Sequence, residues 1–258
     1  MKVAIITGAG SGIGLATAKH LYAMGMAVVG VGRNPEKLAG LESEIADPAR
    51  LATVAIDIAA DEAPQTIVQT ALERFGRIDF LVNNAGLGSP KPLHETDDAM
   101  LDEFLGVMLR APFRLARDVI EHMQPGSAII NVTSTFAVVG GRRGGAYSAA
   151  KGGLTALTLH MACEYGPQGI RSNCVAPGVT VTDMVRHRLK DQAFRRMNTE
   201  MTPAPRLGTV DDVASTIAFF CSPGAEHING QTLVVDGGWS STKYLSPEAI
   251  NAGSTAAG

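Results

Sequence analysis

Short, uninterrupted apolar runs alternate with longer segments of helical periodicity along almost the whole chain. The runs lack the polar alternation of a half-exposed sheet, which predicts strands that are buried on both faces. Seven runs fit this description: Val3–Ile6, Ala27–Val31, Leu51–Ile56, Ile78–Val82, Ala128–Val132, Arg171–Ala176 and Thr232–Val235.

Between these runs, apolar residues recur at the three- and four-residue spacing of helices. The first predicted helix runs from Ile13 to Met24, where Gly25 offers a stop, and Gly76 follows the third as a C-terminal cap would. The other predicted helices are Glu36–Ala46, Ala63–Phe75, Asp98–His122, Tyr147–Tyr165 and Val210–Cys221. Repeated strand–helix–strand units joined by right-handed crossovers predict an α/β fold: a Rossmann-like, doubly wound parallel sheet with helices on both faces.

One domain is expected over residues 1–240, because no linker, repeat or charge block divides the chain. Residues 241–258 are predicted to form a C-terminal extension, of which Asn251–Gly258 is a loose tail with a flexible end.

Composition excludes several classes of protein. The 258 residues are 45% hydrophobic and 18% charged, as in a soluble globule, and the net charge of −3 argues against a nucleic-acid partner. No stretch approaches the length of a membrane span, and the start of the chain does not resemble a signal peptide. Cys163, Cys174 and Cys221 fit buried thiols in a reducing compartment, so we expect a cytoplasmic protein without disulfides or a metal site.

The glycine-rich segment Thr7–Gly14 joins the first strand to the first helix. Backbone N–H groups and a helix N-terminus can approach a pyrophosphate there, because no Cβ stands in the way. The alternative is a plain strand–helix turn, but the flanking strand and helix favour a dinucleotide site. A nucleotide triphosphatase loop is excluded, because Gly14 is followed by Leu15 and Ala16 instead of Lys and Ser or Thr.

The end of the second strand indicates which dinucleotide is bound. An acidic residue there would hold the ribose 2′-hydroxyl of NAD, whereas an arginine would pair with the 2′-phosphate of NADP. Gly32 leaves room and Arg33 supplies positive charge, which favours NADP(H), with NAD(H) possible. Arg33 stacking on adenine or facing solvent is the alternative, and Ser11 adds no second positive charge.

Tyr147 and Lys151 lie four residues apart on a predicted helix and therefore share one face. A free tyrosine ionises near pH ~10, and an ammonium at about 4 Å supplies on the order of 4 kcal/mol, enough to lower that pKa by about two to three units. Such a tyrosine can exchange a proton with an alcohol or carbonyl oxygen, which the upstream Ser134 hydroxyl can hold. Alone, this spacing is more often a helix-surface pair.

Taken together, these segments resemble the short-chain dehydrogenase/reductase family, in its compact single-domain branch, from about Lys2 to Ser240. The similar segments are the glycine turn Thr7–Gly14, Asn83–Gly86 at the end of strand four, the Ser134, Tyr147 and Lys151 set, Pro177–Gly178 with Thr182, and Val235–Gly238.

The resemblance implies an NAD(P)-dependent oxidoreductase (EC 1.1.1.-) that transfers hydride between NADP(H) and a carbonyl or secondary alcohol. It makes Tyr147 the general acid/base, gives Lys151 the tasks of lowering its pKa and binding the nicotinamide ribose, and lets Ser134 orient the substrate oxygen. The implied cofactor-binding residues are Gly8, Gly10, Ser11, Gly12, Ile13, Gly14, Arg33, Asp57, Ile58, Asn84, Ala85, Gly86, Tyr147, Lys151, Pro177, Gly178, Thr180 and Thr182.

Two residues depart from the family pattern. Thr180 stands where a branched apolar residue is commoner, and Met108 occupies the position of a catalytic asparagine. In the family the useful atom there is largely the backbone carbonyl, which holds a water that leads protons away from the lysine. Because Pro112 has no N–H to bond the residue four before it, we expect the Met108 carbonyl to be free for that water. A damaged relay is the alternative.

The substrate region is less defined. Family members carry a variable lid at about residues 183–208, which here is the most basic stretch; it would either attract an anionic substrate or be a solvated helix face. Arg142 and Arg143 raise the same alternatives. Met184, Met197 and Met201 either line an adaptable apolar pocket or pack in the core.

Three alternatives to the oxidoreductase remain open. They are an inactive cofactor-binding or scaffold protein, suggested by Met108; a methyltransferase; and a sugar-nucleotide epimerase, which normally needs a longer chain. The resemblance further implies a homotetramer (or a homodimer) packed through the Asp98–His122 and Tyr147–Tyr165 helices.

Overall fold

The computed structural model describes residues 1–88 and 91–254, with side chains described up to Asn251. Within them lies a seven-stranded, all-parallel sheet in the order β3-β2-β1-β4-β5-β6-β7, which confirms the predicted α/β, Rossmann-like architecture. The strands are β1 (Val3–Thr7), β2 (Ala27–Gly32), β3 (Leu51–Ala55), β4 (Phe80–Asn83), β5 (Ala128–Val132), β6 (Arg171–Pro177) and β7 (Thr232–Val235).

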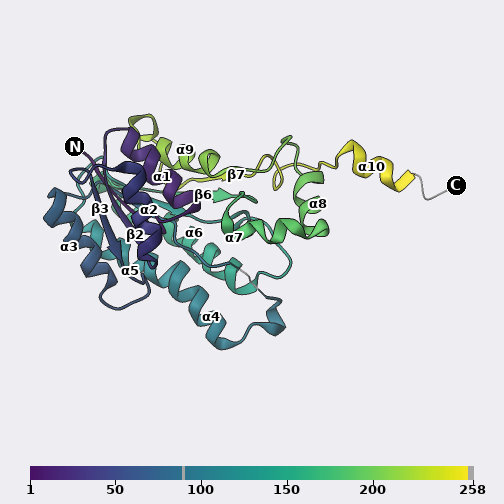
Figure 1. Cartoon of the computed structure of the whole chain (residues 1–258), viewed down its shortest axis with the longest axis horizontal. Coiled ribbons are helices and arrows are strands. Elements are labelled where there is room, and N and C mark those ends of the chain that lie inside the picture. The colour runs from purple at the N-terminus through teal and green to yellow at the C-terminus, as the bar shows by residue number, and fades with distance from the viewer. Residues whose placement is uncertain (89–90, 255–258) are drawn as a thin grey trace.

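Ten α-helices occur in the described residues, and most connect successive strands (Figure 1). They are α1 (Gly12–Ala23), α2 (Pro35–Ile45), α3 (Ala63–Phe75), α4 (Asp98–Leu105), α5 (Ala111–Ile120), α6 (Gly145–Tyr165), α7 (Asp183–Arg186), α8 (Gln192–Glu200), α9 (Val210–Phe220) and α10 (Pro247–Ser254). None of these helices is long and apolar enough to cross a membrane.

Two hydrophobic cores sandwich the sheet, because successive residues of a strand point to opposite faces. In β1, Val3 and Ile5 belong to the core formed with α3, α5 and α6, whereas Ala4 and Ile6 belong to the core formed with α1, α2 and α9. All five residues of β1 are buried, as the uninterrupted apolar run predicts.

The edge strand β7 is an exception to the expected burial. Leu233 is 43% exposed, and the other three residues of β7 are half-buried. Since β7 ends the sheet, it has a neighbouring strand on one side only, and the prediction that all seven strands are buried on both faces is wrong for this one.

Three further expectations need correction. The predicted helix Asp98–His122 is interrupted by a π-helical turn over Gly106–Arg110 and leaves its α-helical form after Ile120. Cys163 is exposed on α6, whereas the other two thiols are buried and all three are free. The predicted loose tail begins inside α10, which projects away from the sheet in Figure 1, while residues 255–258 lie outside the described part.

Candidate active site

The glycine turn occupies the carboxyl edge of the sheet, at the point between β1 and β4 where the strand order reverses. Gly8 and Gly12 have φ angles of 71° and 55°, which favour glycine. A Cβ on Gly14 would stand 2.1 Å from the Gly8 carbonyl oxygen, so only glycine permits this packing. The first turn of α1 contains no acidic residue, and Ser11 makes no side-chain capping bond, which leaves N–H groups directed outward.

The segment Asn83–Gly86 is tied to this turn from the neighbouring strand. The Thr7 hydroxyl oxygen accepts the N–H groups of Asn84 and Ala85 at 3.0 and 3.1 Å. In return the Asn84 side-chain amide donates to the Thr7 carbonyl at 2.9 Å. These hydrogen bonds hold the end of β4 against the glycine turn.

The charged residues that bear on cofactor choice lie at the ends of β2 and β3. Arg33 Nη1 lies 3.6 Å from a carboxylate oxygen of Asp57, and both side chains are about half-exposed. The next residue, Ile58, is buried in the core, so only its backbone remains for a ligand. Lys37 of α2 lies close to the turn as well: a Cβ on Gly10 would be 2.8 Å from the Lys37 Cβ.

The segment after β6 closes the other side of the turn. The Gly178 N–H donates to the Val235 carbonyl at 2.9 Å, which fixes the end of β6 beside β7. Thr180 is buried, and its hydroxyl donates to the Gly178 carbonyl at 3.3 Å. Thr182 reaches back to the glycine turn, since a Cβ on Gly12 would be 3.4 Å from the Thr182 methyl.

Ser134, Tyr147 and Lys151 meet at the carboxyl end of β5. Ser134 follows that strand and caps a short 3₁₀ turn, accepting the Phe136 N–H at 3.2 Å. Tyr147 stands in the first turns of α6, with the rings of Phe104 and Phe136 edge-on to it at centroid distances of 6.5 and 6.4 Å. These two phenylalanines were not predicted as site residues; the position of Phe136, two residues after Ser134, is the one signal that pointed to it.

Lys151 is buried one helical turn beyond Tyr147, with its Nζ 6.0 Å from the centre of the tyrosine ring. Its ammonium donates to the Val132 carbonyl oxygen at 2.7 Å. Burial lowers the pKa of Lys151 to about 8, and the neighbouring Cys174 thiol acts weakly in the opposite direction.

The pKa of Tyr147 is shifted opposite to the expected direction. Burial raises it, and a hydrogen bond with the Ser134 hydroxyl offsets only part of that effect. The Lys151 ammonium does not lower it here, because that group is directed at the Val132 carbonyl and not at the phenol oxygen. Burial therefore favours the neutral, protonated form of the Tyr147 phenol in this structure.

Met108 is fully buried inside the π-helical turn, beside the lysine. A Cβ on Gly86 would lie 3.6 Å from the Met108 sulfur and 3.9 Å from Lys151 Nζ, so these three residues converge. The Ala111 N–H donates to Gly106, five residues back, which is not the α-helical register assumed from the sequence. Gly106 and Pro112 on either side of the turn were the available signals for this break.

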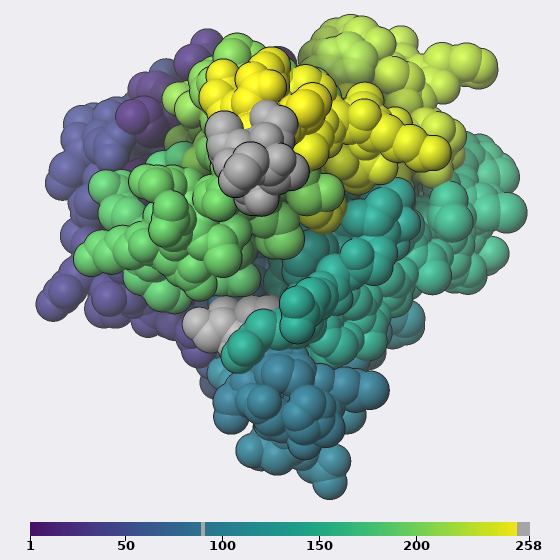
Figure 2. Space-filling model, turned by 90° about the vertical axis from the view of Figure 1, so that its right-hand side faces the viewer, coloured from purple at the N-terminus to yellow at the C-terminus, as the bar shows by residue number. Residues whose placement is uncertain are grey.

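The predicted lid, 183–208, contains α7 and α8 and borders the site opposite the segment that leads into α6 (Figure 2). Its arginines are largely engaged at the surface: Arg186 pairs with Asp183, Arg196 with Glu200, and Arg188 stacks on Phe194. These contacts favour the solvated-face interpretation of the basic residues.

The other residues predicted for the substrate region are exposed. Arg142 and Arg143 have exposed side chains, and Arg143 has a φ of 59°, an uncommon value for a residue other than glycine. Met184 packs over Gly88 but remains half-exposed, as do Met197 and Met201. These methionines are therefore not core residues.

Known proteins match this chain over nearly its full length. The family model described as Enoyl-(Acyl carrier protein) reductase matches residues 8–240. An A-factor type gamma-butyrolactone 1′-reductase (1S-forming) from Streptomyces virginiae is 36% identical over 244 residues, covering 92% of this chain and 95% of the relative. L-rhamnose 1-dehydrogenase (NAD(P)(+)) from Azotobacter vinelandii is 37% identical, with coverages of 92% and 96%.

Among solved structures, a gluconate 5-dehydrogenase from Burkholderia cenocepacia in complex with NADP and tartrate superposes with a TM-score of 0.86. It is 33% identical in sequence, and the match covers 93% of this chain and 96% of the other.

Proposed function

The chain belongs to the short-chain dehydrogenase/reductase family of NAD(P)-dependent oxidoreductases, and we propose that it transfers hydride between NADP(H) and a carbonyl or secondary alcohol. The observation that carries the proposal is the meeting of Ser134, Tyr147 and Lys151 beside the glycine turn. One edge of the sheet thus holds both a glycine turn that can bind a nucleotide and a side chain that can donate a proton.

The residues present fit a nicotinamide dinucleotide. Gly8, Gly12 and the uncapped start of α1 suit a pyrophosphate, and Arg33 with Lys37 suits the extra phosphate of NADP(H). Asp57, the Asn84–Gly86 segment and Pro177–Thr182 flank these groups along the same edge, and Lys151 would hold the nicotinamide ribose. The bound cofactor supplies the hydride.

The proton chemistry belongs to the protein. Tyr147, kept protonated by burial, donates its hydroxyl proton to the oxygen of a carbonyl substrate, and Ser134 holds that oxygen by a hydrogen bond. The Lys151 ammonium stabilises the negative charge that develops on the phenol oxygen. Carbonyl reduction uses the phenol in its protonated form, while alcohol oxidation requires the phenol to lose its proton first.

We retain the backbone carbonyl of Met108 as the outlet for protons near Lys151. The π-helical turn supports this assignment, because a widened turn followed by Pro112 leaves backbone carbonyls without intrahelical donors. In the reduction direction this path runs inward: Lys151 would pass a proton to the Tyr147 phenolate and regain one from a water at that carbonyl, without help from an amide side chain.

The surroundings of the site favour a substrate with an apolar body. Phe104 and Phe136 flank the tyrosine, and exposed apolar side chains stand nearby on the lid and loops, among them Leu93 and Met184. Exposed Phe113 on α5 and Leu159 on α6 support the expected homotetramer packed through these helices. A cytoplasmic location stays a prediction.

Replacement of Tyr147 tests the proposal. With NADPH and a panel of cyclic and open-chain ketones, Tyr147→Phe should lose about 10²–10⁴-fold in kcat, because the proton donor is removed. Tyr165→Phe, at the other end of α6, is the matched control and should retain parental kcat. NADPH binding, followed by its fluorescence, should stay within about threefold in both variants.

Two outcomes of this experiment would contradict the proposal. A parent that binds NADPH but reduces no ketone would point to the scaffold alternative. A parent that binds no nicotinamide cofactor would overturn the proposal altogether.

A further inference from the structure

Phe136 connects the turn after β5 to the loop that leads into α6. It is the middle residue of the 3₁₀ turn Thr135–Ala137, which follows Ser134 directly. Its N–H donates to the Ser134 hydroxyl oxygen at 3.2 Å, and the Ala137 N–H donates to the Ser134 carbonyl at 2.9 Å. The backbone of Phe136 is therefore fixed to the serine of the Ser134, Tyr147 and Lys151 set.

Two glycines of the following loop, Gly141 and Gly144, approach the Phe136 ring from opposite edges, and we call this pair the glycine slot. A Cβ on Gly141 would stand 2.5 Å from Cε1 and Cζ of the ring, and one on Gly144 would stand 3.3 Å from Cδ2. Carbon atoms in ordinary contact are about 3.5–4.0 Å apart, so a side chain at Gly141 would displace the ring. The Ser148 N–H donates to the Gly144 carbonyl at 2.7 Å, which ties the slot to the first turn of α6.

The ring that occupies the glycine slot also packs against Tyr147. The centroids of the Phe136 and Tyr147 rings are 6.4 Å apart and their planes are inclined by 84°, an edge-to-face geometry that aromatic pairs favour. Phe104 of α4 makes a second contact of this kind, at 6.5 Å and 76°. Phe104 is fixed by the core, being 2% exposed, whereas Phe136 is half-buried and lies on a connection. The contact with Phe136 thus depends on the glycine slot.

These ring contacts matter because few polar contacts fix the tyrosine. Its hydroxyl bonds with Ser134, but the Lys151 ammonium is directed at the Val132 carbonyl. The outer torsion of a tyrosine side chain has broad energy wells, so one hydrogen bond at the tip does not fix the plane of the ring. The neighbouring rings supply the missing restraint.

We propose that Phe136 is a positioning residue, which holds the Tyr147 ring in the orientation that keeps its hydroxyl beside Ser134. This inference rests on the proposed hydride transfer and deepens it. Phe136 exchanges no proton itself and acts through Tyr147, so that the tyrosine and the serine meet the same substrate oxygen. A displacement of about 1 Å in such an arrangement can cost on the order of 100-fold in rate.

Two substitutions disturb the contact in different ways. Phe136→Ala removes the ring, whereas Gly141→Ala keeps the ring and fills the slot. Both should lower kcat for ketone reduction by about 10- to 100-fold and leave the Kd for NADPH within about threefold of the parent value. Gly140→Ala is the matched control in the same loop, because a Cβ there meets nothing within 4 Å, and it should retain the parental kcat.

A second readout needs no turnover. With tyrosine labelled by ¹³C at Cζ, the Tyr147 resonance, assigned by its loss in Tyr147→Phe, reports whether the phenol is ionised. At pH 10, where a free tyrosine is about half ionised, the parent phenol should stay neutral, because burial raises the pKa of Tyr147. Both slot variants should be partly ionised, since the displaced ring admits water.

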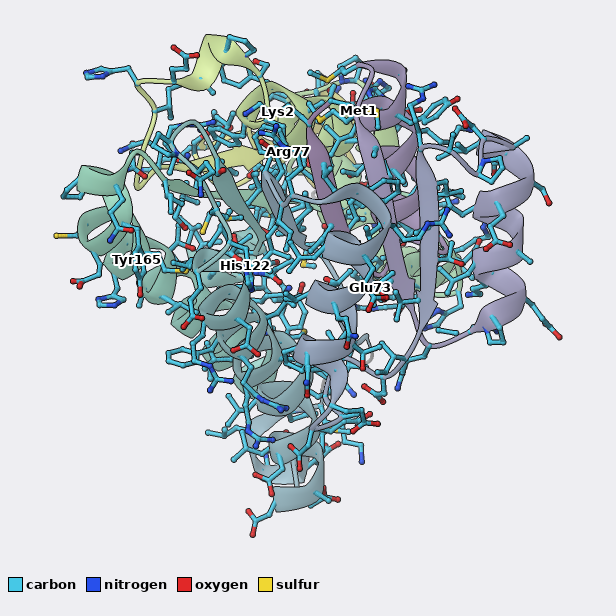
Figure 3. All side chains as sticks on the ribbon, turned by 90° about the vertical axis from the view of Figure 1, so that its left-hand side faces the viewer. Met1, Lys2, Glu73, Arg77, His122 and Tyr165 are labelled. Carbon is cyan, nitrogen blue, oxygen red and sulfur yellow. The ribbon has the colours of Figure 1, made fainter. Side chains whose placement is uncertain are left out.

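Tyr165 provides an internal reference for this measurement. It ends α6 and is labelled in Figure 3, which views the amino edge of the sheet, whereas Tyr147 lies in the first turns of the same helix. The Tyr165 resonance should therefore be the same in the parent and in all variants.

The outcomes separate this inference from the proposed function. If the parent reduces ketones and the two slot variants keep its kcat, the role of Phe136 is overturned while the proposed function stands. The role is overturned as well if Gly140→Ala loses as much kcat as Gly141→Ala. If the parent reduces no ketone, the proposed function fails, and unchanged ionisation of Tyr147 in the variants would overturn the role of Phe136 separately. Should Phe136→Ala not fold, Gly141→Ala decides alone, because it keeps every native side chain.

Discussion

Asp79 and Lys151 are charged side chains buried at opposite edges of the sheet, and their surroundings differ. At the amino edge, Asp79 is 1% exposed and is surrounded by donors: the Val3 N–H at 2.9 Å, Lys2 at 3.0 Å and Arg77 through two bonds of 2.7 and 2.8 Å. At the carboxyl edge, Lys151 is 4% exposed, and among the described residues its ammonium donates to one neutral partner, the Val132 carbonyl.

The pKa values of the two groups record this difference. Burial raises the pKa of Asp79, but hydrogen bonds from Arg77, Lys2 and Val3 together outweigh it and hold that pKa below its usual range. For Lys151, burial dominates and lowers the pKa to about 8. A charge supplied with partners stabilises the fold, whereas a charge left without a counter-ion costs stability and is available for chemistry.

Loss of the Asp79 carboxylate should have the largest effect on stability. Asp79→Asn is expected to lower the free energy of unfolding by about 3 kcal/mol, because it removes charge-assisted bonds at a buried site. Urea denaturation at pH 7 measures the effect. Because the folded pKa is lowered, this contribution is present at neutral pH and is lost as the pH falls below about 4.

Asp118, which pairs with Arg117 at the surface, provides the matched control. Asp118→Asn should change stability by less than about 1 kcal/mol, since exposed pairs contribute little. If Asp79→Asn and Asp118→Asn lose equal stability, the partners of Asp79 stabilise the fold no more than a surface ion pair does, and the contrast with Lys151 fails.

Features that depend on local sequence could be predicted, whereas features that depend on contacts between distant segments could not. Apolar runs locate the strands to within about two residues, because burial on both faces leaves a continuous signal in the chain. The glycine turn and the Tyr147–Lys151 spacing are equally local features. The direction in which Lys151 points is not local: it depends on a carbonyl nineteen residues away in sequence, so the raised pKa of Tyr147 could not be derived from the helix alone.

The same limit applies to other surprises. The π-helical turn lies where α4 and the turn itself pack against α6, and the Lys37–Gly10 approach joins two connections that are separate in the chain. Arg171 reads as an ordinary strand residue in the sequence, and only the structure shows that its buried Nη1 has no hydrogen-bond partner among the described residues.

Removal of the Lys151 charge should raise stability and abolish activity together. Lys151→Met is expected to increase the free energy of unfolding by about 2 kcal/mol at pH 7, because an uncompensated buried charge is replaced by an apolar chain of similar length. The lowered folded pKa makes the cost complete below pH 8, and it declines as the pH rises toward the unfolded value of about 10.4. Lys19→Met, on the exposed side of α1, should change neither stability nor activity appreciably. A destabilised Lys151→Met protein would mean that the ammonium is compensated after all.

The smallest effect concerns the pH dependence of the reaction. If the Lys151 ammonium stabilises the developing phenolate, kcat/KM for ketone reduction should be level below pH 8 and fall above it, by about tenfold at pH 9, because kcat/KM reports the free enzyme's groups. The value of kcat/KM falls as the pH rises because the protonated form of Lys151 is the active one. Asp79→Asn should leave this profile unchanged, since its edge takes no part in the chemistry. A profile that stays level to pH 9.5 would place the pKa of Lys151 near its ordinary value. Burial without a counter-ion would then not have lowered that pKa, and the contrast with Asp79 would fail.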